Sequence, residues 1–310
     1  MSATSKIEWT DRTWNPVRGC SIVSPGCVNC YAMKQAHRFS GEGKPYHGLT
    51  KQTKAGPQWT GRVLMYPHLD DEPLQWREPA RVFVNSMSDL FHQGVHSAFI
   101  ETIFYTMAEA HWHTFQILTK RPKRMRDEVR YLAGRLLADG HRWPLPNVWL
   151  GVSVENQKYA DKRIPPLLQT PAAVRFISAE PLLGPVDIEP YASRNVLGVN
   201  DASGGLDWVI VGGESGPGAR PFDLAWARSI VQQCKAAGVP CFVKQLGGVP
   251  TMPDADWRRG VPGNSGSVYL LNHRNAKRVP PDYVPLKFFD KKGGNPDEWP
   301  TDLQVREFPC

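Results

Sequence analysis

The stretch VWLGVSVE, residues 148–155, decides the fold class, because it is almost entirely apolar until it ends in a carboxylate. Two later stretches repeat this pattern: VRFISAE at 174–180 and WVIVGGE at 208–214. A strand that is apolar on both faces is buried on both sides, which is typical of a parallel sheet covered by helices. The sequence therefore predicts an α/β protein with a parallel sheet.

Similar strands alternate with amphipathic helices along most of the chain. Further strands are expected at 81–90, 115–122 and 239–248, and one near the N-terminal cysteines. Helices are expected at 96–110, 125–137, 156–168 (interrupted by Pro165 and Pro166) and 222–237, with a loop insertion at 191–205. The uninterrupted series predicts a parallel (β/α) barrel, complete or partial, over residues 1–248. Residues 249–310 are expected to form an irregular C-terminal extension that packs on it.

Length and composition narrow the class of protein. The 310 residues carry a formal net charge of +7, which favours a polyanionic partner. There is no apolar run of about 18 residues, so no membrane partner is expected. The N-terminal residues do not resemble a signal peptide. We therefore expect a cytoplasmic monomer, in which cysteine thiols stay reduced.

Polar side chains follow the expected strand ends. They are Asn85, Ser86, Asp89, Lys120, Glu155, Glu180, Glu214, Lys244 and Gln245. In parallel barrels the carboxyl ends of the strands build the active site, so these side chains are candidates for a polar-ligand site. The alternative is that the glutamates cap helices or pair with Arg and Lys.

A run of basic residues begins at the end of the strand expected at 115–122. Residues 120–130 hold six Lys or Arg residues and two acids. The candidate nucleic-acid contacts are Lys120, Arg121, Lys123 and Arg124. The alternative is a solvated helix start, which is what most charge runs are.

Three of the six cysteines lie close together: Cys20, Cys27 and Cys30. Three thiolates on one loop can hold three irons of a [4Fe–4S] cluster and leave the fourth iron open. A zinc site completed by His37, or a redox pair formed by Cys27 and Cys30, are the alternatives. Because the loop leads directly into the α/β series, the iron–sulfur interpretation is favoured.

The cysteine loop and its surroundings resemble the phage-associated three-cysteine-motif proteins. The motifs that carry the resemblance are EWT at 8–10, TWNP at 13–16, CSIVSPGCVNCYA at 20–32, SMSDLF at 86–91, LTKRP at 118–122, GVSVE at 151–155, SAEPLLG at 178–184, GGESG at 212–216, FVKQLGG at 242–248, KKGG at 291–294 and EWP at 298–300. That family is similar to a divergent branch of the radical S-adenosylmethionine (SAM) enzymes, and distantly to spore photoproduct lyase. The sequence departs from the usual radical SAM pattern in two places. The gap between Cys20 and Cys27 is longer, and Asn29 stands before Cys30 where that superfamily often has an aromatic residue.

The resemblance implies a function and a site. Cys20, Cys27 and Cys30 would hold a [4Fe–4S] cluster, and SAM bound to it would yield a 5′-deoxyadenosyl radical. The implied SAM contacts are a turn containing Asn85, Ser86 and Ser88 for the amino group, Lys120 for the carboxylate, Ser153 and Glu155 for the ribose, and Glu180, Glu214 and Lys244 for adenine or substrate. No residue is assigned as the group that reacts with substrate.

Three functions follow from these patterns. The first is a radical SAM enzyme that repairs or modifies DNA or RNA, of lyase or modifying type, with or without a separate partner protein. The second is a radical SAM enzyme that acts on a protein or a small molecule. The third is a zinc-containing nucleic-acid-binding protein without catalysis. The basic run favours the first.

Overall fold

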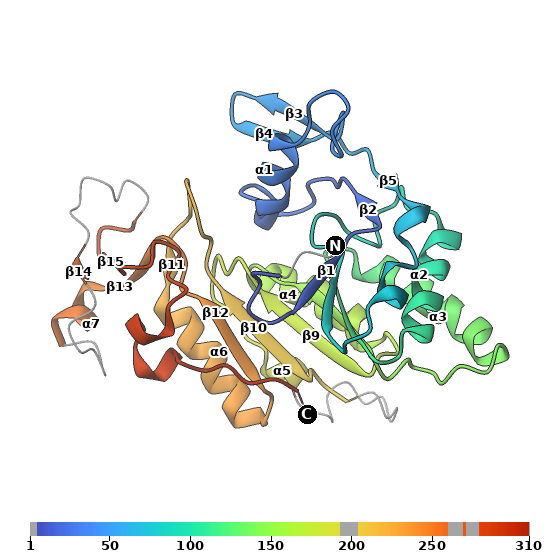
Figure 1. Ribbon diagram of the computed structural model, residues 1–310. Helices are drawn as coiled ribbons and strands as arrows, with labels where there is room; N and C mark the ends of the chain where they lie inside the picture. Colours follow the sequence, from blue (N-terminus) through green and yellow to red (C-terminus); the bar gives the residue numbers. More distant parts are fainter. Residues whose placement is uncertain (1–4, 193–203, 260–268, 271–278, 310) are drawn as a thin grey trace. The chain divides into compact units, whose positions relative to one another are not determined.

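The computed structural model of the protein describes residues 5–192, 204–259, 269–270 and 279–309 (Figure 1). The chain divides into two compact units. The first comprises residues 1–152 and 163–175, and the second comprises residues 153–162 and 176–310. Within the described ranges, no helix is both long and apolar enough to cross a membrane.

A seven-stranded sheet has the strand order β1-β6-β7-β8-β9-β10-β12. The strands are β1 (Arg12–Trp14), β6 (Arg81–Val84), β7 (Thr114–Thr119), β8 (Val148–Ser153), β9 (Val174–Ala179), β10 (Trp208–Gly212) and β12 (Cys241–Gln245). β1, β6, β7 and β8 pair in parallel in the first unit, and β9, β10 and β12 do so in the second. The α/β class and the partial parallel barrel predicted from the apolar strands are confirmed.

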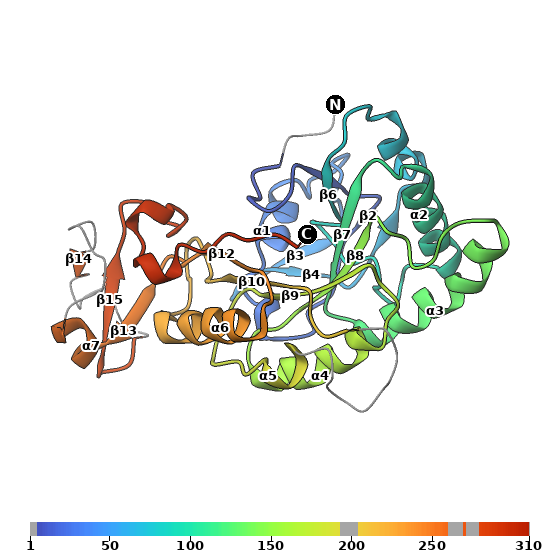
Figure 2. The same ribbon diagram turned by 90° about the horizontal axis from the view of Figure 1, so that it is seen from below.

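Helices α2 (Ser97–Glu109) and α3 (Pro122–Ala138) pack outside the strands of the first unit (Figure 2). The apolar face of α2 buries Ile100, Ile103, Phe104 and Met107, which are at most 1% exposed. These residues recur at the spacing of one helical face, which is why the sequence predicts this helix well.

An N-terminal layer of the first unit contains α1 (Tyr31–Arg38) and a hairpin of β3 (Thr50–Thr53) and β4 (Gly56–Trp59) (Figure 1). Met33 and Ala36 of α1 pack against Leu49 and Trp59 in a small apolar core. A second short pair, β2 (Val17–Arg18) with β5 (Leu64–Met65), joins residues before and after this layer. The sequence did not predict α1, the hairpin or the β2–β5 pair, because these elements are too short to show a clear periodicity.

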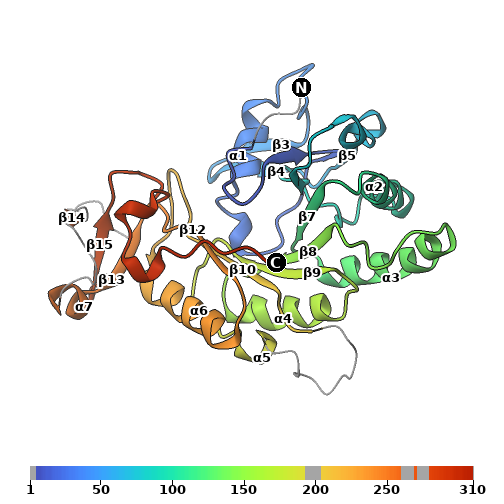
Figure 3. The ribbon, with the colours of Figure 1, turned by 60° about the horizontal axis from the view of Figure 1, so that its bottom comes forward.

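In the second unit, α6 (Leu224–Ala237) packs beside β10 and β12 (Figure 3). It begins where the Asp223 side chain accepts a hydrogen bond from the Ala225 amide, and it ends at Gly238, which has a φ of 67°. Such a left-handed residue after the last turn is the usual glycine helix stop.

The second unit also contains a four-stranded sheet of order β11-β13-β15-β14. Its strands are β11 (Phe222–Asp223), β13 (Pro250–Pro253), β14 (Tyr269–Leu270) and β15 (Tyr283–Lys287). The short helix α7 (Asp254–Arg259) lies between β13 and β14 along the chain. Residues after 248 therefore include regular strands as well as irregular segments. Their apolar content is low and their strands are short, so periodicity does not reveal them.

One expected helix and one expected loop of the second half of the chain compare differently with the structure. Helix α4 (Gln157–Leu168) continues through Pro165 and Pro166, which were expected to interrupt it. Both prolines lie in its last turn, so the helix loses backbone bonds only near its end, and the Thr170 hydroxyl donates to the Pro166 carbonyl there. The loop insertion predicted at 191–205 lies mostly outside the described residues, and the short helix α5 (Glu189–Ala192) precedes it.

Candidate functional site

The three-cysteine loop follows the first strand of the parallel sheet in the first unit. Gly19, just before Cys20, forms an isolated parallel bridge with Ser88, in the turn that follows β6. Gly19 has a φ of 91°, and a Cβ there would lie 2.3 Å from the Arg62 carbonyl oxygen. Only glycine fits this close approach of two backbones. The loop therefore begins at a fixed point on the carboxyl end of the sheet.

The three thiols are free and share one environment. Cys20 and Cys30 pack against the apolar core of α1 and the hairpin. Burial, with a smaller contribution from the Asp89 carboxylate, raises the pKa of Cys20 to about 12, although the Arg121 guanidinium opposes the rise. Burial also raises the pKa of Cys30, against the lowering effect of the Met33 amide and of Lys120. Thiols in such surroundings become thiolates only when a strong cation binds them.

A turn after β6 lies against the start of this loop. The Asn85 side-chain oxygen accepts from the Val17 amide at 3.2 Å, and the Ser88 hydroxyl donates to the Val17 carbonyl at 2.8 Å. Ser86 Oγ donates to Asn15 Oδ1 at 3.2 Å. The sequence-predicted turn and the cysteine loop are thus brought together in one unit.

Asn85 is a conformational exception in this turn. It is 3% exposed and has a positive φ of 61°. Its side-chain Nδ2 is buried and has no hydrogen-bond partner among the described residues. A buried amide donor without a partner is costly, so Asn85 presents a donor that a ligand could satisfy.

Arg121 connects the loop to the strand ends. Its Nη1 lies 2.6 Å from Asp89 Oδ2 and 3.9 Å from Cys20 Sγ, and its Nη2 donates to Ser21 Oγ at 2.8 Å. The Thr119 hydroxyl donates to Asp89 Oδ1 at 2.7 Å. This network places a fixed guanidinium beside the first cysteine.

His92 extends the same network. Its Nε2 lies 2.9 Å from Ser21 Oγ. Burial lowers the pKa of His92, and the positive charge of Arg121 lowers it further. Sequence reasoning missed Ser21 and His92 because neither spacing nor residue type connects positions 21, 92 and 121 before folding.

His37, the candidate fourth ligand of a zinc site, has another partner. His37 Nδ1 lies 3.1 Å from the Thr50 hydroxyl, a partner in the hairpin. No group of three or more His, Cys, Asp or Glu side chains among the described residues, the three cysteines included, is arranged to hold a metal ion.

The predicted SAM and substrate residues of the second unit form pairs with their own neighbours. Glu180 Oε1 accepts from Lys244 Nζ at 2.6 Å and from Gln245 Nε2 at 3.0 Å. A Cβ on Gly212 would lie 3.2 Å from the Glu180 carboxyl carbon, so glycine leaves room for this carboxylate. Glu180 therefore sits at a strand end, as expected, and is ion-paired there.

The other carboxylates of this unit are also enclosed. Glu214 is ion-paired with Arg220, whose amide and Nε each donate to Glu214 Oε2 at 3.0 Å. Ser153 and Glu155 are 2% and 0% exposed. Pairing with Arg and Lys was the alternative interpretation of the strand-end glutamates, and it describes Glu180 and Glu214.

The basic run divides into partly buried and exposed cations. Arg121 is engaged by Asp89, and Arg124 donates to the carbonyls of His92 and Val95 and pairs with Glu128. Lys123 is exposed, and Lys120 is half-buried beside Cys30. The guanidinium groups of Arg121 and Arg124 are thus engaged by groups of the protein, and the nucleic-acid role of Lys120, Arg121, Lys123 and Arg124 stays a prediction.

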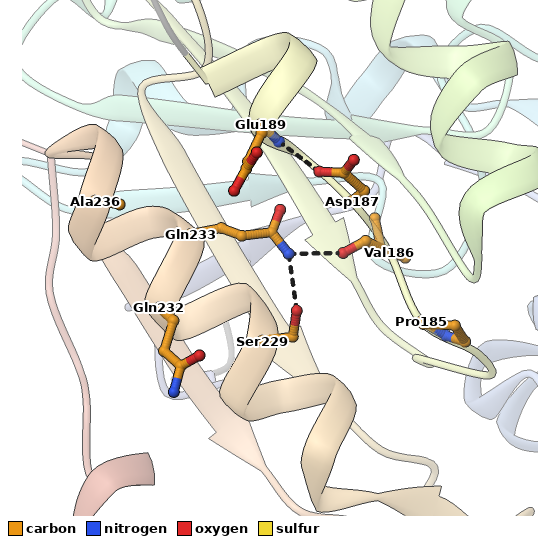
Figure 4. A pocket seen from close by; sticks show the side chains of 8 residues that line it. All are labelled: Pro185, Val186, Asp187, Glu189, Ser229, Gln232, Gln233 and Ala236. Atoms are coloured by element: carbon orange, nitrogen blue, oxygen red, sulfur yellow. Dashed lines mark hydrogen bonds between the residues drawn. The ribbon is translucent and has the colours of Figure 1, made fainter.

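Two surface pockets lie away from these groups. One of about 490 Å³ lies between α5 and α6 and is lined by Pro185, Val186, Asp187, Glu189, Ser229, Gln232, Gln233 and Ala236 (Figure 4). Gln233 spans it and donates to the Val186 carbonyl and to Ser229. The other lies between α2 and α3. Neither is lined by a residue predicted for the site.

Fold and site together define an α/β protein with a partial parallel barrel and a three-cysteine loop after its first strand. The sequence model of one family matches residues 4–279, and the chain belongs to this family, which is described as "Protein of unknown function (DUF5131)". No curated protein sequence matches the chain.

Two solved structures of spore photoproduct lyase mutants, in which a cysteine is replaced by serine or alanine, are similar to the chain. The first is 12% identical with a TM-score of 0.39, and the match covers 72% of this chain and 58% of the lyase chain. The second is 10% identical with a TM-score of 0.37, and the match covers 94% of this chain and 72% of the lyase chain. The chain spans less than two thirds of the first lyase chain.

Proposed function

We propose that the protein is a radical SAM enzyme that repairs or modifies nucleic acid. The observation that carries the proposal is the placement of the three free thiols. Cys20, Cys27 and Cys30 share one loop that starts at the carboxyl end of the parallel sheet, next to the turn at Asn85 and the guanidinium of Arg121. The family resemblance of the cysteine motif supports the same function.

The donor set suits an iron–sulfur cluster better than a single zinc ion. The ligands of one zinc ion must meet at a single atom, at about 2.3 Å from each sulfur. His37, the candidate fourth ligand of zinc, instead has Thr50 as its partner. The ligands of a cluster bind different irons and therefore stand farther apart. Cys20 and Cys30 pack against the same apolar core, and the Cys30 amide donates to the Cys27 carbonyl, which supports one shared site for the three thiols.

The first unit also offers groups for SAM. The unpartnered Nδ2 of Asn85 would donate to an acceptor of the ligand, and Lys120, which is close enough to Cys30 to lower its pKa, would attract a carboxylate. When bound, cluster and SAM supply one-electron cleavage and hydrogen abstraction. The chain's own part is to bind, orient and exclude water. The roles of Ser86, Ser88, Ser153, Glu155, Glu180 and Glu214 stay predictions.

Nucleic acid is the proposed substrate class because the chain is basic, with a net charge of +7. A protein or a small molecule is the alternative substrate, and a separate partner protein is compatible with either. The phage association also stays a prediction.

The experiment is SAM cleavage by anaerobically reconstituted protein with dithionite, with 5′-deoxyadenosine measured by chromatography. The wild type should form 5′-deoxyadenosine, and Cys27→Ala should form none. Cys234→Ala is the matched control, because Cys234 is buried on α6 in the other unit and should cleave SAM like the wild type. Equal cleavage by wild type and Cys27→Ala would contradict the proposal.

A further inference from the structure

The positive charge of the chain is concentrated in one segment. Residues 12–69 contain eight of the 37 Lys and Arg residues but only one of the 30 acidic residues, Glu42, so the segment carries +7. The rest of the chain holds 29 basic and 29 acidic residues and has no net charge. The formal net charge of the protein therefore lies entirely in the segment that contains the cysteine loop, α1 and the β3–β4 hairpin.

Most cations of this segment face solvent. Arg12 and Arg18 stack on aromatic rings, of Trp76 at 5.1 Å and of Tyr66 at 4.3 Å. The exposed cations are Arg38, Lys44, Lys51, Lys54 and Arg62, and none of these five forms an ion pair with a described carboxylate. We call these five residues the basic surface. Exposed cations without neutralising acids attract polyanions.

Arg38 of α1 and Lys51 of β3 stand on elements that pack against each other. Helix α1 and the hairpin lie side by side (Figure 1), and His37 Nδ1 lies 3.1 Å from Thr50 Oγ1. Beneath them, Met33 and Trp59 are 2% and 7% exposed in a common apolar core. The cations are therefore presented by a packed layer of the first unit, which lowers the cost of ordering them on binding.

Two exposed aromatic rings accompany these cations. Tyr31, at the start of α1, is 70% exposed, and Phe39, which follows its last residue, is 53% exposed. Exposed rings beside cations are the combination with which proteins bind single-stranded nucleic acid, because bases stack on the rings while cations contact phosphates.

We propose that the basic surface binds the phosphodiester backbone of single-stranded nucleic acid, with bases stacked on Tyr31 and Phe39. This inference rests on the proposed function and names the surface by which its substrate docks, in place of the basic run at 120–124. An acidic protein is less well suited. A protein interface needs an apolar centre, and hairpin residues 50–59, which carry Lys51 and Lys54, expose no large apolar side chain. The exposed aliphatic side chains of the segment, Ile22, Val23 and Val28, lie in the cysteine loop.

The test is fluorescence anisotropy with a labelled 20-nucleotide single-stranded DNA at several NaCl concentrations. Lys51→Ala/Lys54→Ala should weaken binding by on the order of tenfold at low salt, and reduce the slope of log K against log salt by about 1.4, since each single-strand phosphate contact contributes about 0.7. The control is Lys158→Ala/Lys162→Ala, which removes two exposed lysines of α4 outside the segment and should bind like the wild type.

Stacking is tested with Phe39→Ala. This variant should bind the DNA more weakly but bind an abasic oligonucleotide of equal length like the wild type, whereas Phe289→Ala, a change of another exposed ring, should alter neither. Equal affinities and salt slopes for the two double-lysine variants would overturn the proposal. So would equal competition by poly-glutamate of matched charge, which would indicate an acidic protein partner.

Iron content and SAM cleavage are measured on the same preparations. Cluster-containing protein that cleaves SAM but binds no DNA would overturn the basic surface and leave the radical SAM proposal standing. DNA binding that depends on Lys51 and Lys54, in protein that assembles no cluster, would support the surface and overturn the radical SAM proposal.

Discussion

The guanidinium of Arg121 lies 2.6 Å from the carboxylate of Asp89, and the same nitrogen lies 3.9 Å from the sulfur of Cys20. The side chains of Arg121 and Asp89 are only 13% and 7% exposed. Asp89 follows β6 and Arg121 follows β7, so the pair ties two neighbouring strand ends to the cysteine loop. The pair orients the guanidinium toward Cys20 Sγ, where a hydrogen-bond donor would tune the proposed cluster.

We predict that removing one member of this pair destabilises the protein strongly. Asp89→Asn should lower the free energy of unfolding by about 3 kcal/mol, because it leaves the Arg121 charge buried without its partner. The measurement is urea unfolding followed by circular dichroism. The matched control is Asp11→Asn, which breaks the more exposed pair with Arg81 and should cost less than about 1 kcal/mol. Equal losses in the two variants would refute this account of the pair.

The Cys20 thiol should react slowly in metal-free protein. Its pKa of about 12, against an ordinary 9.0, means about 1000-fold less thiolate at pH 8 than an exposed cysteine has. Iodoacetamide labelling, followed by peptide mass spectrometry, should show slow modification of Cys20 that accelerates as the pH rises toward 12. Rapid labelling at pH 8 in folded protein would contradict the buried position.

The same pKa shift has a consequence for stability. The unfolded thiol loses its proton near pH 9 and the folded one only near pH 12. The stabilisation from this group is therefore fully present below pH 9 and is lost as the pH rises from 9 to 12. Urea unfolding of Cys20→Ala should show a weaker decline in stability over this interval than the wild type does.

Gly247 should not tolerate a side chain. It has a φ of 80°, and a Cβ there would lie 2.8 Å from the Glu214 carbonyl oxygen. Gly247→Ala should lower the free energy of unfolding by about 2 kcal/mol or more. In contrast, Gly134→Ala on α3, where a Cβ meets nothing within 4 Å, should raise it by up to about 1 kcal/mol. Thermal unfolding of both variants measures the difference, and a stable Gly247→Ala variant would contradict the tight backbone packing.

Substitutions of Arg124 and Lys123 should differ in their effect on stability, because only Arg124 is bonded within the protein. Arg124→Ala removes bonds to the carbonyls of His92 and Val95, so the melting temperature should fall by several degrees. Lys123→Ala changes an exposed side chain and should leave the melting temperature within about 1 °C. An Arg124→Ala variant with an unchanged melting temperature would show that these bonds do not stabilise the segment after β6.

The strands and long helices could be predicted because burial imposes a periodicity that the sequence displays directly. The stretch at 148–155 is apolar because β8 is covered on both faces, and α2 shows one apolar stripe. The N-terminal layer could not be predicted in this way. Its hairpin is polar, and its core needs Met33 and Trp59, which are far apart in sequence.

The candidate site was predictable only where neighbours in sequence share a role. The three cysteines and the turn at Asn85 were found from spacing and from strand ends. The role of Arg121 was not, because a basic run suggests solvent, whereas the Asp89 carboxylate and Ser21 draw this guanidinium inward. The pairing of Glu180 with Lys244 likewise depends on two strands that are adjacent only after folding.

The most direct test of the central claim is metal and sulfide analysis of anaerobically purified protein, with visible absorbance, for wild type and Cys27→Ala. The account predicts brown wild-type protein with about four irons and four sulfides per chain, and a variant that has lost them. Colourless protein that holds one zinc, even after reconstitution with iron and sulfide, would contradict it.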